Sequence, residues 1–326
     1  MPIVPTDPLE RLADSLERSA PSKRMLMIVN PYATTVSDRL KNLVVYALQG
    51  RYEVDAIETQ ARDHATELCQ EAARERYDVV VAFGGDGTVN EAANGLAGSG
   101  TPLTCLPGGR TNVYCRMLGI PTDVVDATEH LLRLADDWHP RRVDIAHVND
   151  RHFLFSAGAG LDASVVAAVD AHARLKARYG EWYYTAVGVR TFARRYLFRP
   201  VRLEVTLDGM DVTGVSAIVQ NGTPYTYFGE RPVNMAEGAD LSSGDLAGVV
   251  LERASAFDIP TIMWRALSRR ALVSSHRRVY AFAGISGLRV RSLDDRPVPL
   301  QVDGDYIGAV PEATFGVTPG GLAVIA

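Results

Sequence analysis

The sequence has little of what would place a chain in a specialised class. It has three cysteines in 326 residues, and their spacing fits neither a zinc site nor a disulfide framework, so we expect ordinary reduced thiols. No apolar run reaches the roughly 18 residues of a membrane-spanning helix, and the first residues lack the apolar segment of a secretory signal. A net charge of −5 argues against a dedicated nucleic-acid binder, so we expect no nucleic-acid partner.

The overall composition is that of an ordinary globular protein. Apolar residues make up 47% of the chain and charged residues 22%. At roughly 150 residues per domain, the length predicts two domains. We expect residues 1–23 to form an N-terminal arm, because prolines are followed by an amphipathic helical pattern over 7–19.

Residues 24–140 are predicted to form an α/β domain with a parallel sheet. Apolar runs typical of buried strands lie at 24–30, 52–58, 78–83 and 102–106. Helical patterns between them cover 36–49, 62–76 and 89–96. Strands that alternate with helices indicate βαβ units, with helices on both faces of the sheet.

Residues 141–326 are predicted to form a β-sandwich-like domain with inserted helices. Short, partly alternating runs predict strands at 152–156, 201–207, 212–220, 247–252, 278–283, 288–292 and 298–302. Helical patterns interrupt them at 164–198 and 259–271. The final strands could also pack back on the first domain.

Glycine is concentrated around one predicted strand-to-helix connection. Eight glycines fall between Gly84 and Gly109, where the average content predicts about two. The string GGDGTVNE (84–91) follows a buried strand and leads into a helix. Glycine lets a ligand approach the backbone, and a helix N-terminus offers free N–H groups, so the string predicts a phosphate site. Thr88 is expected to cap the helix, with Glu91 completing a capping box.

Asp86 lies inside this string, where a carboxylate would repel phosphate. It becomes useful if it binds a bridging metal or accepts a proton, and both roles belong to phosphoryl transfer. The alternative is a plain tight turn. A second glycine pattern, G-x-G-x-x-A at 158–163, could indicate a dinucleotide site, but we favour a packing turn because no βαβ unit follows it.

Several motifs together resemble the diacylglycerol kinase catalytic-domain family, which includes bacterial lipid kinases and sphingosine kinases. The motifs are IVNP (28–31), GGDGTVNE (84–91), LPGGRTN (106–112), LGIP (118–121), RVD (142–144), FSAGAGLD (155–162) and VDGD (302–305). The resemblance spans residues 24–326. It implies an ATP site between two domains and transfer of the γ-phosphoryl group of Mg-ATP to a lipid hydroxyl, with diacylglycerol the expected acceptor and phosphatidic acid the product.

The resemblance also implies which residues bind and react. The expected ATP-binding residues are Asn30, Thr59, Gly84, Gly85, Asp86, Gly87, Thr88, Val89, Asn90, Gly109, Arg110 and Thr111. Arg110 is unusual for the family, and we expect it to contact phosphate directly. Asp305 stands where the family has the glutamate proposed as base. Asp86 is the rival base or magnesium partner, and Asp144 could support either.

Other features remain open at this level. Ser243 replaces an acid of the family's structural metal site, so any metal would use Asp240 and Asp245. The basic, aromatic stretch 174–202 and the arginines at 265–278 suit an anionic membrane, or else form a solvated helix face. We expect a cytoplasmic enzyme, peripheral at the inner face of the membrane, and leave a homodimer open. The alternatives are a sphingoid-base or other lipid kinase, an NAD-kinase-like enzyme with a soluble substrate, or a non-catalytic nucleotide or lipid sensor.

Overall fold

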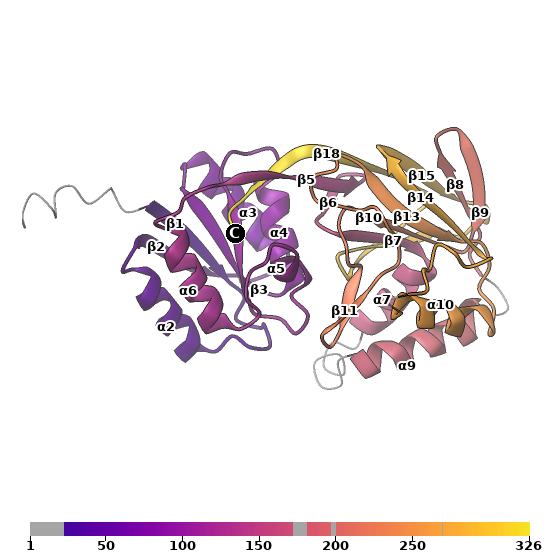
Figure 1. Cartoon of the computed structure of the whole chain (residues 1–326), viewed down its shortest axis with the longest axis horizontal. Helices are drawn as coiled ribbons and strands as arrows, with labels where there is room; N and C mark the ends of the chain where they lie inside the picture. The colour runs from indigo at the N-terminus through magenta and orange to yellow at the C-terminus, as the bar shows by residue number, and fades with distance from the viewer. Residues whose placement is uncertain (1–22, 172–180, 197–199, 269) are drawn as a thin grey trace, which may run out of the picture.

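The computed structural model describes residues 23–171, 181–196, 200–268 and 270–326. The predicted helical arm at 7–19 lies outside the described residues. A parallel sheet forms the first half of the chain and an antiparallel β-sandwich the second (Figure 1), which confirms the predicted fold class.

The first half contains four parallel strands in the order β2-β1-β3-β4. They are β1 (Lys23–Val29), β2 (Tyr52–Glu58), β3 (Val79–Gly84) and β4 (Leu103–Pro107). The helices are α2 (Asp38–Leu48), α3 (His64–Arg74), α4 (Asp86–Leu96), α5 (Val113–Met117) and α6 (Val124–Leu134). Because α2 contacts α6 and α3 contacts α4, the helices cover the sheet as two pairs.

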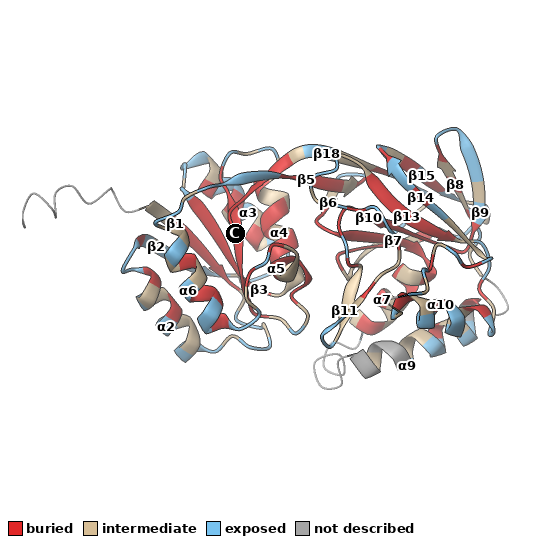
Figure 2. Cartoon of the chain, in the orientation of Figure 1, coloured by how far each residue is buried: buried red, intermediate tan, exposed pale blue. Residues whose placement is uncertain are grey.

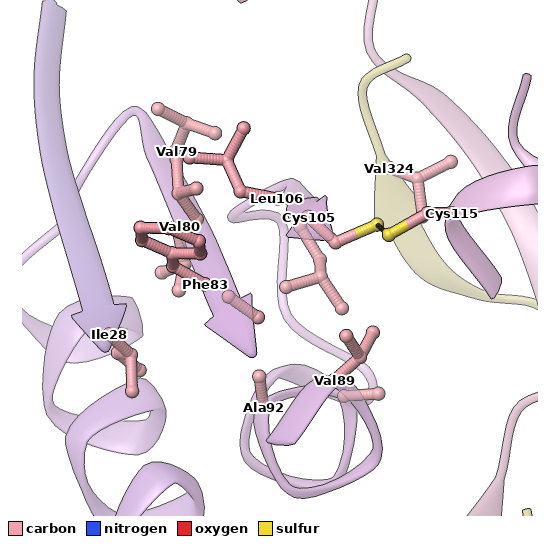
Figure 3. Close-up of a cluster of buried hydrophobic side chains, with 14 of the residues drawn as sticks. Ile28, Val79, Val80, Phe83, Val89, Ala92, Cys105, Leu106, Cys115 and Val324 are labelled. Carbon is pink, nitrogen blue, oxygen red and sulfur yellow. Dashed lines mark hydrogen bonds between the residues drawn. The ribbon is translucent and has the colours of Figure 1, made fainter. Parts of the chain in front are cut away.

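The core of this half explains why its strands read as continuous apolar runs. Every residue of β3 is buried, as expected for an inner strand of a sheet covered on both faces. Figure 3 shows Phe83 of β3, Leu106 of β4 and Val89 of α4 in one cluster. The thiols of Cys105 and Cys115 join it as free, buried cysteines with Sγ atoms 2.9 Å apart.

The second half contains the sandwich and its helices. Its strands are β5 (Arg141–Val148), β6 (Arg151–Phe153), β7 (Ser156–Gly160), β8 (Leu203–Leu207), β9 (Met210–Gly214), β10 (Ser216–Gln220), β11 (Thr226–Phe228), β12 (Arg231–Val233), β13 (Leu246–Leu251), β14 (Val279–Ile285), β15 (Gly287–Ser292), β16 (Val298–Val302), β17 (Asp305–Val310) and β18 (Glu312–Val324). Its helices are α7 (Leu161–Asp170), α9 (Glu181–Thr191) and α10 (Asp258–Ala266), and the chain continues from α9 into a π-helical turn, Phe192–Tyr196.

Two sheets pack face to face in this half. One has the order β14-β13-β10-β7-β16-β17, and the other contains β5, β6, β8, β9, β15 and most of β18. Phe153, Phe315 and Leu246 are among the buried side chains between them. Figure 2 shows the inner strands as buried and helix α10 as a mixture of buried, intermediate and exposed residues.

Strand β18 joins the two halves. Its first residues pair with β15, its later residues pair with β5, and Val324 pairs with Leu103 of β4 in the parallel sheet. Figure 1 shows β18 and β5 running side by side across the junction. A single ten-stranded sheet therefore extends through both halves.

Three predictions about the second half need correction. The run 152–156 is not one strand, because β6 ends at Phe153 and β7 begins at Ser156. The run 212–220 is two strands, β9 and β10, because the chain crosses between the sheets at Val215, whose N–H donates to the carbonyl of Leu251 at 2.8 Å. The helix predicted over 164–198 begins earlier, at Leu161, and α7 ends at Asp170. Residues 172–180 and 197–199 of that prediction lie outside the described residues.

Candidate functional site

The predicted phosphate-binding segments meet at one edge of the parallel sheet. Asn30 follows β1, Thr59 follows β2, the glycine string follows β3, and Gly109 lies just after β4. The carboxyl ends of neighbouring parallel strands share an edge, and ligands bind there where the strand order reverses. In the order β2-β1-β3-β4, that point lies between β1 and β3.

The glycines let two loops pack backbone against backbone at this edge. A Cβ atom on Gly108 would lie 2.8 Å from the Cα of Gly84, and one on Gly109 would lie 2.9 Å from the Cα of Gly85. Both distances are shorter than real Cβ contacts, so any larger residue would separate the loops. The close approach therefore gives a structural cause for four of the eight glycines: Gly84, Gly85, Gly108 and Gly109.

The helix starts earlier than predicted, which corrects the expected cap. Helix α4 begins at Asp86 with Gly85 as its N-cap, so neither Thr88 nor Glu91 forms a capping box. The hydroxyl of Thr88 instead accepts a hydrogen bond from Nδ2 of Asn30 at 3.0 Å. This bond ties the end of β1 to the first turn of α4 and orients both polar groups at the same edge.

A compact turn follows β4. The side chain of Asn112 accepts a hydrogen bond from the N–H of Gly109 and donates one to its carbonyl, both at 2.8 Å. Asn112 takes a positive φ of 46°, which asparagine tolerates better than most residues. Arg110 and Thr111 lie within the turn, where Arg110 is exposed and Thr111 is half-buried.

Asp305, from the second half of the chain, reaches the glycine string. It is the first residue of β17 and is half-buried. A Cβ atom on Gly87 would lie 2.6 Å from Oδ2 of Asp305, so the carboxylate lies directly against the backbone of this glycine. The structure thus brings Asp305 to Asp86 and Gly87, although Asp305 lies 219 residues after Asp86 in the sequence.

The Asp86 carboxylate faces in a different direction. It accepts a hydrogen bond from the N–H of Tyr114 at 3.1 Å, at the start of α5. Removal from water is the main cause that raises the pKa of Asp86, and the negative charge of Asp305 adds to it, while the backbone N–H groups of Val113 and Tyr114 oppose it. The two carboxylates therefore act on each other electrostatically.

Asn90 connects α4 to the second half of the chain. Its Nδ2 donates to Oδ2 of Asp303 at 2.8 Å and to the carbonyl of His152 at 3.0 Å, while its Oδ1 accepts from Arg151 at 3.0 Å. Asn94, one turn later, also bonds the backbone of His152. These contacts hold the helix of the glycine string against β6, and a role for Asn90 in binding ATP stays a prediction.

Asp303 is a buried residue of the site that the sequence did not predict. Its carboxylate accepts three backbone hydrogen bonds, from Leu154, Phe155 and Ser156, at 2.7 to 3.0 Å, besides the bond from Asn90. Burial raises the pKa of Asp303 to about 6, against the opposing effect of these donors. The only signal in the sequence was the motif VDGD, in which Asp303 stands two residues before Asp305.

Asp144 has backbone partners away from the glycine string. Its two carboxylate oxygens accept from the N–H groups of Gly244 and Gly320, at 2.6 and 2.8 Å. These bonds join β5 to β18 and to the turn that carries the predicted metal ligands. The contacts do not support a catalytic role for Asp144, which stays a prediction.

The predicted metal ligands lie in one turn. The hydroxyl of Ser243 donates to Oδ1 of Asp245 at 2.7 Å and to the backbone carbonyl of Asp240 at 3.0 Å. Within the described residues, no group of three or more His, Cys, Asp or Glu side chains could hold a metal ion. A metal on Asp240 and Asp245 therefore stays a prediction without a third acidic ligand.

A cavity of about 510 Å³ lies in the second half, and Asp305 itself is not among the residues that line it. Its lining includes Tyr306, the next residue after Asp305, and Tyr196, whose hydroxyl is hydrogen-bonded to that of Ser164 at 2.8 Å. Arg194 and Arg296 also line it. Both arginines are exposed to solvent to a large extent, so they lie toward the mouth of the cavity.

The second glycine pattern is not a turn: it lies where strand β7 passes directly into helix α7, and its residues are closely packed. Gly160 has a φ of 82°, and a Cβ atom there would lie 2.4 Å from the carbonyl oxygen of Val215. Both oxygens of Asp162 are used by side chains of the sandwich, Tyr225 at 2.6 Å and Gln301 at 2.8 Å. Close packing inside the sandwich accounts for these residues without a ligand.

A glycine loop at the switch point of a parallel sheet, faced by a carboxylate from a β-sandwich, is an arrangement that suits a phosphotransferase. The sequence pattern described as diacylglycerol kinase catalytic domain matches residues 24–148. The pattern described as YegS C-terminal NAD kinase beta sandwich-like domain matches residues 156–326. The chain belongs to the diacylglycerol kinase family of lipid kinases, whose members use ATP.

Individual relatives agree with this assignment. A diacylglycerol kinase of Staphylococcus aureus (strain bovine RF122 / ET3-1) is 28% identical over 295 residues, covering 89% of this chain and 88% of its own. A crystal structure of a diacylglycerol kinase from Bacillus anthracis str. Sterne shares the fold, with a TM-score of 0.68 at 21% identity. That alignment covers 94% of this chain and 98% of the other. Among the described residues, no helix is both long and apolar enough to cross a bilayer.

Proposed function

We propose that this chain transfers the γ-phosphoryl group of ATP to a hydroxyl group of diacylglycerol, which gives phosphatidic acid. One observation carries the proposal: Oδ2 of Asp305, from the β-sandwich, lies against Gly87 of the glycine string. A carboxylate beside a phosphate-binding backbone is useful where a hydroxyl must lose a proton next to a phosphoryl group. The pair thus joins a phosphate site with a base.

The edge of the parallel sheet supplies the nucleotide site in this proposal. Backbone N–H groups of the string 84–90 and of the turn 109–111 would bind phosphate oxygens, with the positive end of α4 adding to the attraction. Asn30 and Thr88, held together by their hydrogen bond, would orient the phosphates from the β1 side. Thr59 and Arg110 would complete the site, Arg110 by a direct contact with phosphate.

Asp305 is proposed as the base and Asp86 as its electrostatic partner. Asp305 would accept the proton of the acceptor hydroxyl as that oxygen attacks the γ-phosphorus and ADP leaves. Asp86 is fixed by the N–H of Tyr114 and is less able to turn toward an acceptor. The Asp86 carboxylate is an oxygen ligand of the kind that magnesium prefers, so Asp86 would help to hold Mg²⁺ at this site. When bound, it would neutralise charge on the phosphates.

The cavity lined by Tyr306 is proposed to receive the acceptor. Its volume of about 510 Å³ lies within the range of small-molecule sites. Tyr306, which lines it, directly follows the proposed base in β17, so the cavity lies one residue along the strand from Asp305. On this proposal the enzyme works at the cytoplasmic face of a membrane as a peripheral protein. A homodimer stays a prediction.

Labelled phosphate transfer tests the proposal. The wild-type chain is incubated with γ-labelled ATP, magnesium and one acceptor at a time: diacylglycerol or sphingosine dispersed in detergent, or NAD in the same detergent solution. We expect label on diacylglycerol, and loss of transfer by about 10²- to 10⁴-fold in Asp305→Asn with ATP affinity retained. Label on sphingosine or NAD alone would replace the acceptor. No transfer to any acceptor, despite ATP binding, would favour a nucleotide sensor.

A further inference from the structure

Helix α10 turns an apolar face to solvent. Asp258, Ile262 and Ala266, spaced four residues apart, are buried against the sandwich. The opposite face carries Phe257 and Trp264, seven residues apart, whose exposed fractions are 86% and 63%. A surface helix of a soluble domain normally turns polar residues outward, so this face lacks the usual pattern.

The exposed apolar side chains continue beyond the helix. In the part of the chain that the structure describes, five exposed large apolar residues fall within 257–272: Phe257, Met263, Trp264, Leu267 and Leu272. We call these five residues the α10 patch. Such clustering on a surface indicates an interaction site, whereas single exposed apolar residues need no explanation.

Positive charge surrounds the α10 patch. Residues 252–278 contain six arginines and two acids, although the whole chain has a net charge of −5. Arg253, Arg270 and Arg277 are exposed. Asp258 is buried, with its Oδ1 3.6 Å from the Arg277 guanidinium, so it offsets only part of this charge. The partner must therefore be both apolar and anionic.

The α10 patch lies on the same side of the sandwich as the proposed acceptor cavity. Ile259 of α10 packs in one cluster with Tyr196 and Phe192 of the π-helical turn, and Tyr196 lines the cavity. Figure 1 shows α10 beside α9 along this side of the second half. A surface that meets a bilayer at this side would bring the cavity close to lipid.

We propose that the α10 patch docks this protein on an anionic lipid bilayer. Phe257 and Trp264 would enter the headgroup region, where aromatic side chains bind well, while the exposed arginines would meet lipid phosphates. The inference rests on the proposed function, because an enzyme that phosphorylates diacylglycerol must reach it in a membrane. It adds the element and the side chains that make the contact.

Vesicle sedimentation tests this docking surface. The wild-type chain and the double variant Phe257→Ser/Trp264→Ser are mixed with vesicles of phosphatidylglycerol and phosphatidylcholine. We expect the partition coefficient of the variant to fall about 30- to 100-fold, roughly tenfold for each large side chain. The matched control, Tyr46→Ser/Met210→Ser, removes side chains that are 78% and 54% exposed on α2 and β9, and should bind like the wild type.

Two further measurements test the role of the arginines and the insertion of Trp264 separately. Arg253→Gln/Arg270→Gln should weaken binding to anionic vesicles several-fold and leave weak binding to pure phosphatidylcholine unchanged. In a chain with Trp138→Phe and Trp182→Phe, Trp264 is the remaining tryptophan, and brominated lipid should quench its fluorescence.

The results separate this inference from the proposed function. Equal vesicle binding by wild type and Phe257→Ser/Trp264→Ser, or no quenching of Trp264, would overturn the docking surface even if phosphate transfer in detergent succeeds. A change of oligomeric state by light scattering, with vesicle binding unchanged, would make the patch a contact between copies and would also overturn it. Failure of transfer in detergent would overturn the proposed function while leaving vesicle binding measurable.

Discussion

Gly87→Ala is the sharpest perturbation of the proposed site, because it moves Asp305 without removing it. The added Cβ would lie 2.6 Å from Oδ2 of Asp305, whereas ordinary contact begins near 3.4 Å. The short side chain of Asp305 can retreat by about 0.8 Å, and displacements near 1 Å cost on the order of 100-fold in rate. Alanine in α4 should leave the free energy of unfolding unchanged or raise it by up to about 1 kcal/mol.

A double-mutant cycle measures whether this effect passes through Asp305. Phosphate transfer is followed for Gly87→Ala, Asp305→Asn and the double variant, with ATP affinity measured by calorimetry for each. If Gly87→Ala acts by displacing the base, it should change the rate little in the Asp305→Asn background. Gly100→Ala is the control, because a Cβ there has open space. Independent, additive losses from the two changes would refute the reasoning.

Three more predictions concern the residues that support the site. Asn90→Ala removes the hydrogen bonds to Asp303 and His152, and should lower the free energy of unfolding in urea titrations by about 2–3 kcal/mol. A loss below about 0.5 kcal/mol would show that these contacts between α4 and the second half are unimportant for stability. Because the pKa of Asp303 is raised from 3.8 to about 6, the folded state holds its proton more tightly than the unfolded state does. The free energy of unfolding should therefore fall by up to about 3 kcal/mol as the pH rises from 4 to 6. Asp303→Asn should remove that part of the slope, and an unchanged slope would contradict the assignment. Asn112→Ala should loosen the turn at Gly109 and weaken ATP binding about tenfold by calorimetry, and unaltered affinity would exclude this turn from the site.

The first half of the chain could be predicted well from its sequence. The strand predicted at 52–58 has those bounds in the structure, and the other three parallel strands differ by one residue at either end. Buried parallel strands leave an unambiguous continuous apolar run, and the helices between them follow a clear period. The start of α4 was missed because glycines at 84, 85 and 87 are typical of a loop, although the helix already begins at Asp86.

The second half shows where local patterns stop being informative. The apolar run 212–220 gave no sign that the chain leaves one sheet for the other at Val215. Strand β18 was missed because Pro319 and the two glycines after it are typical of a break, yet the strand continues past this point with a shift in register. Pairing with distant partners decides both cases, and such pairing is not written in the local sequence.

The functional site was also only partly predictable from the sequence. The glycine string and its neighbours could be found because spacing and residue type report a phosphate-binding backbone. The contacts of Asp303 with Leu154 and Asn90 could not be predicted, because 149 and 213 residues separate these partners along the chain. The placement of Asp305 against Gly87 depends equally on how the sandwich packs on the parallel sheet.

Hydrogen–deuterium exchange with and without Mg-ATP tests most directly where nucleotide binds. Binding at the carboxyl ends of the parallel strands should slow exchange of backbone amides in 84–90 and 109–111, and leave exchange in the glycine pattern at 158–163 unchanged. Slowed exchange at 158–163, with 84–90 unaffected, would contradict the account.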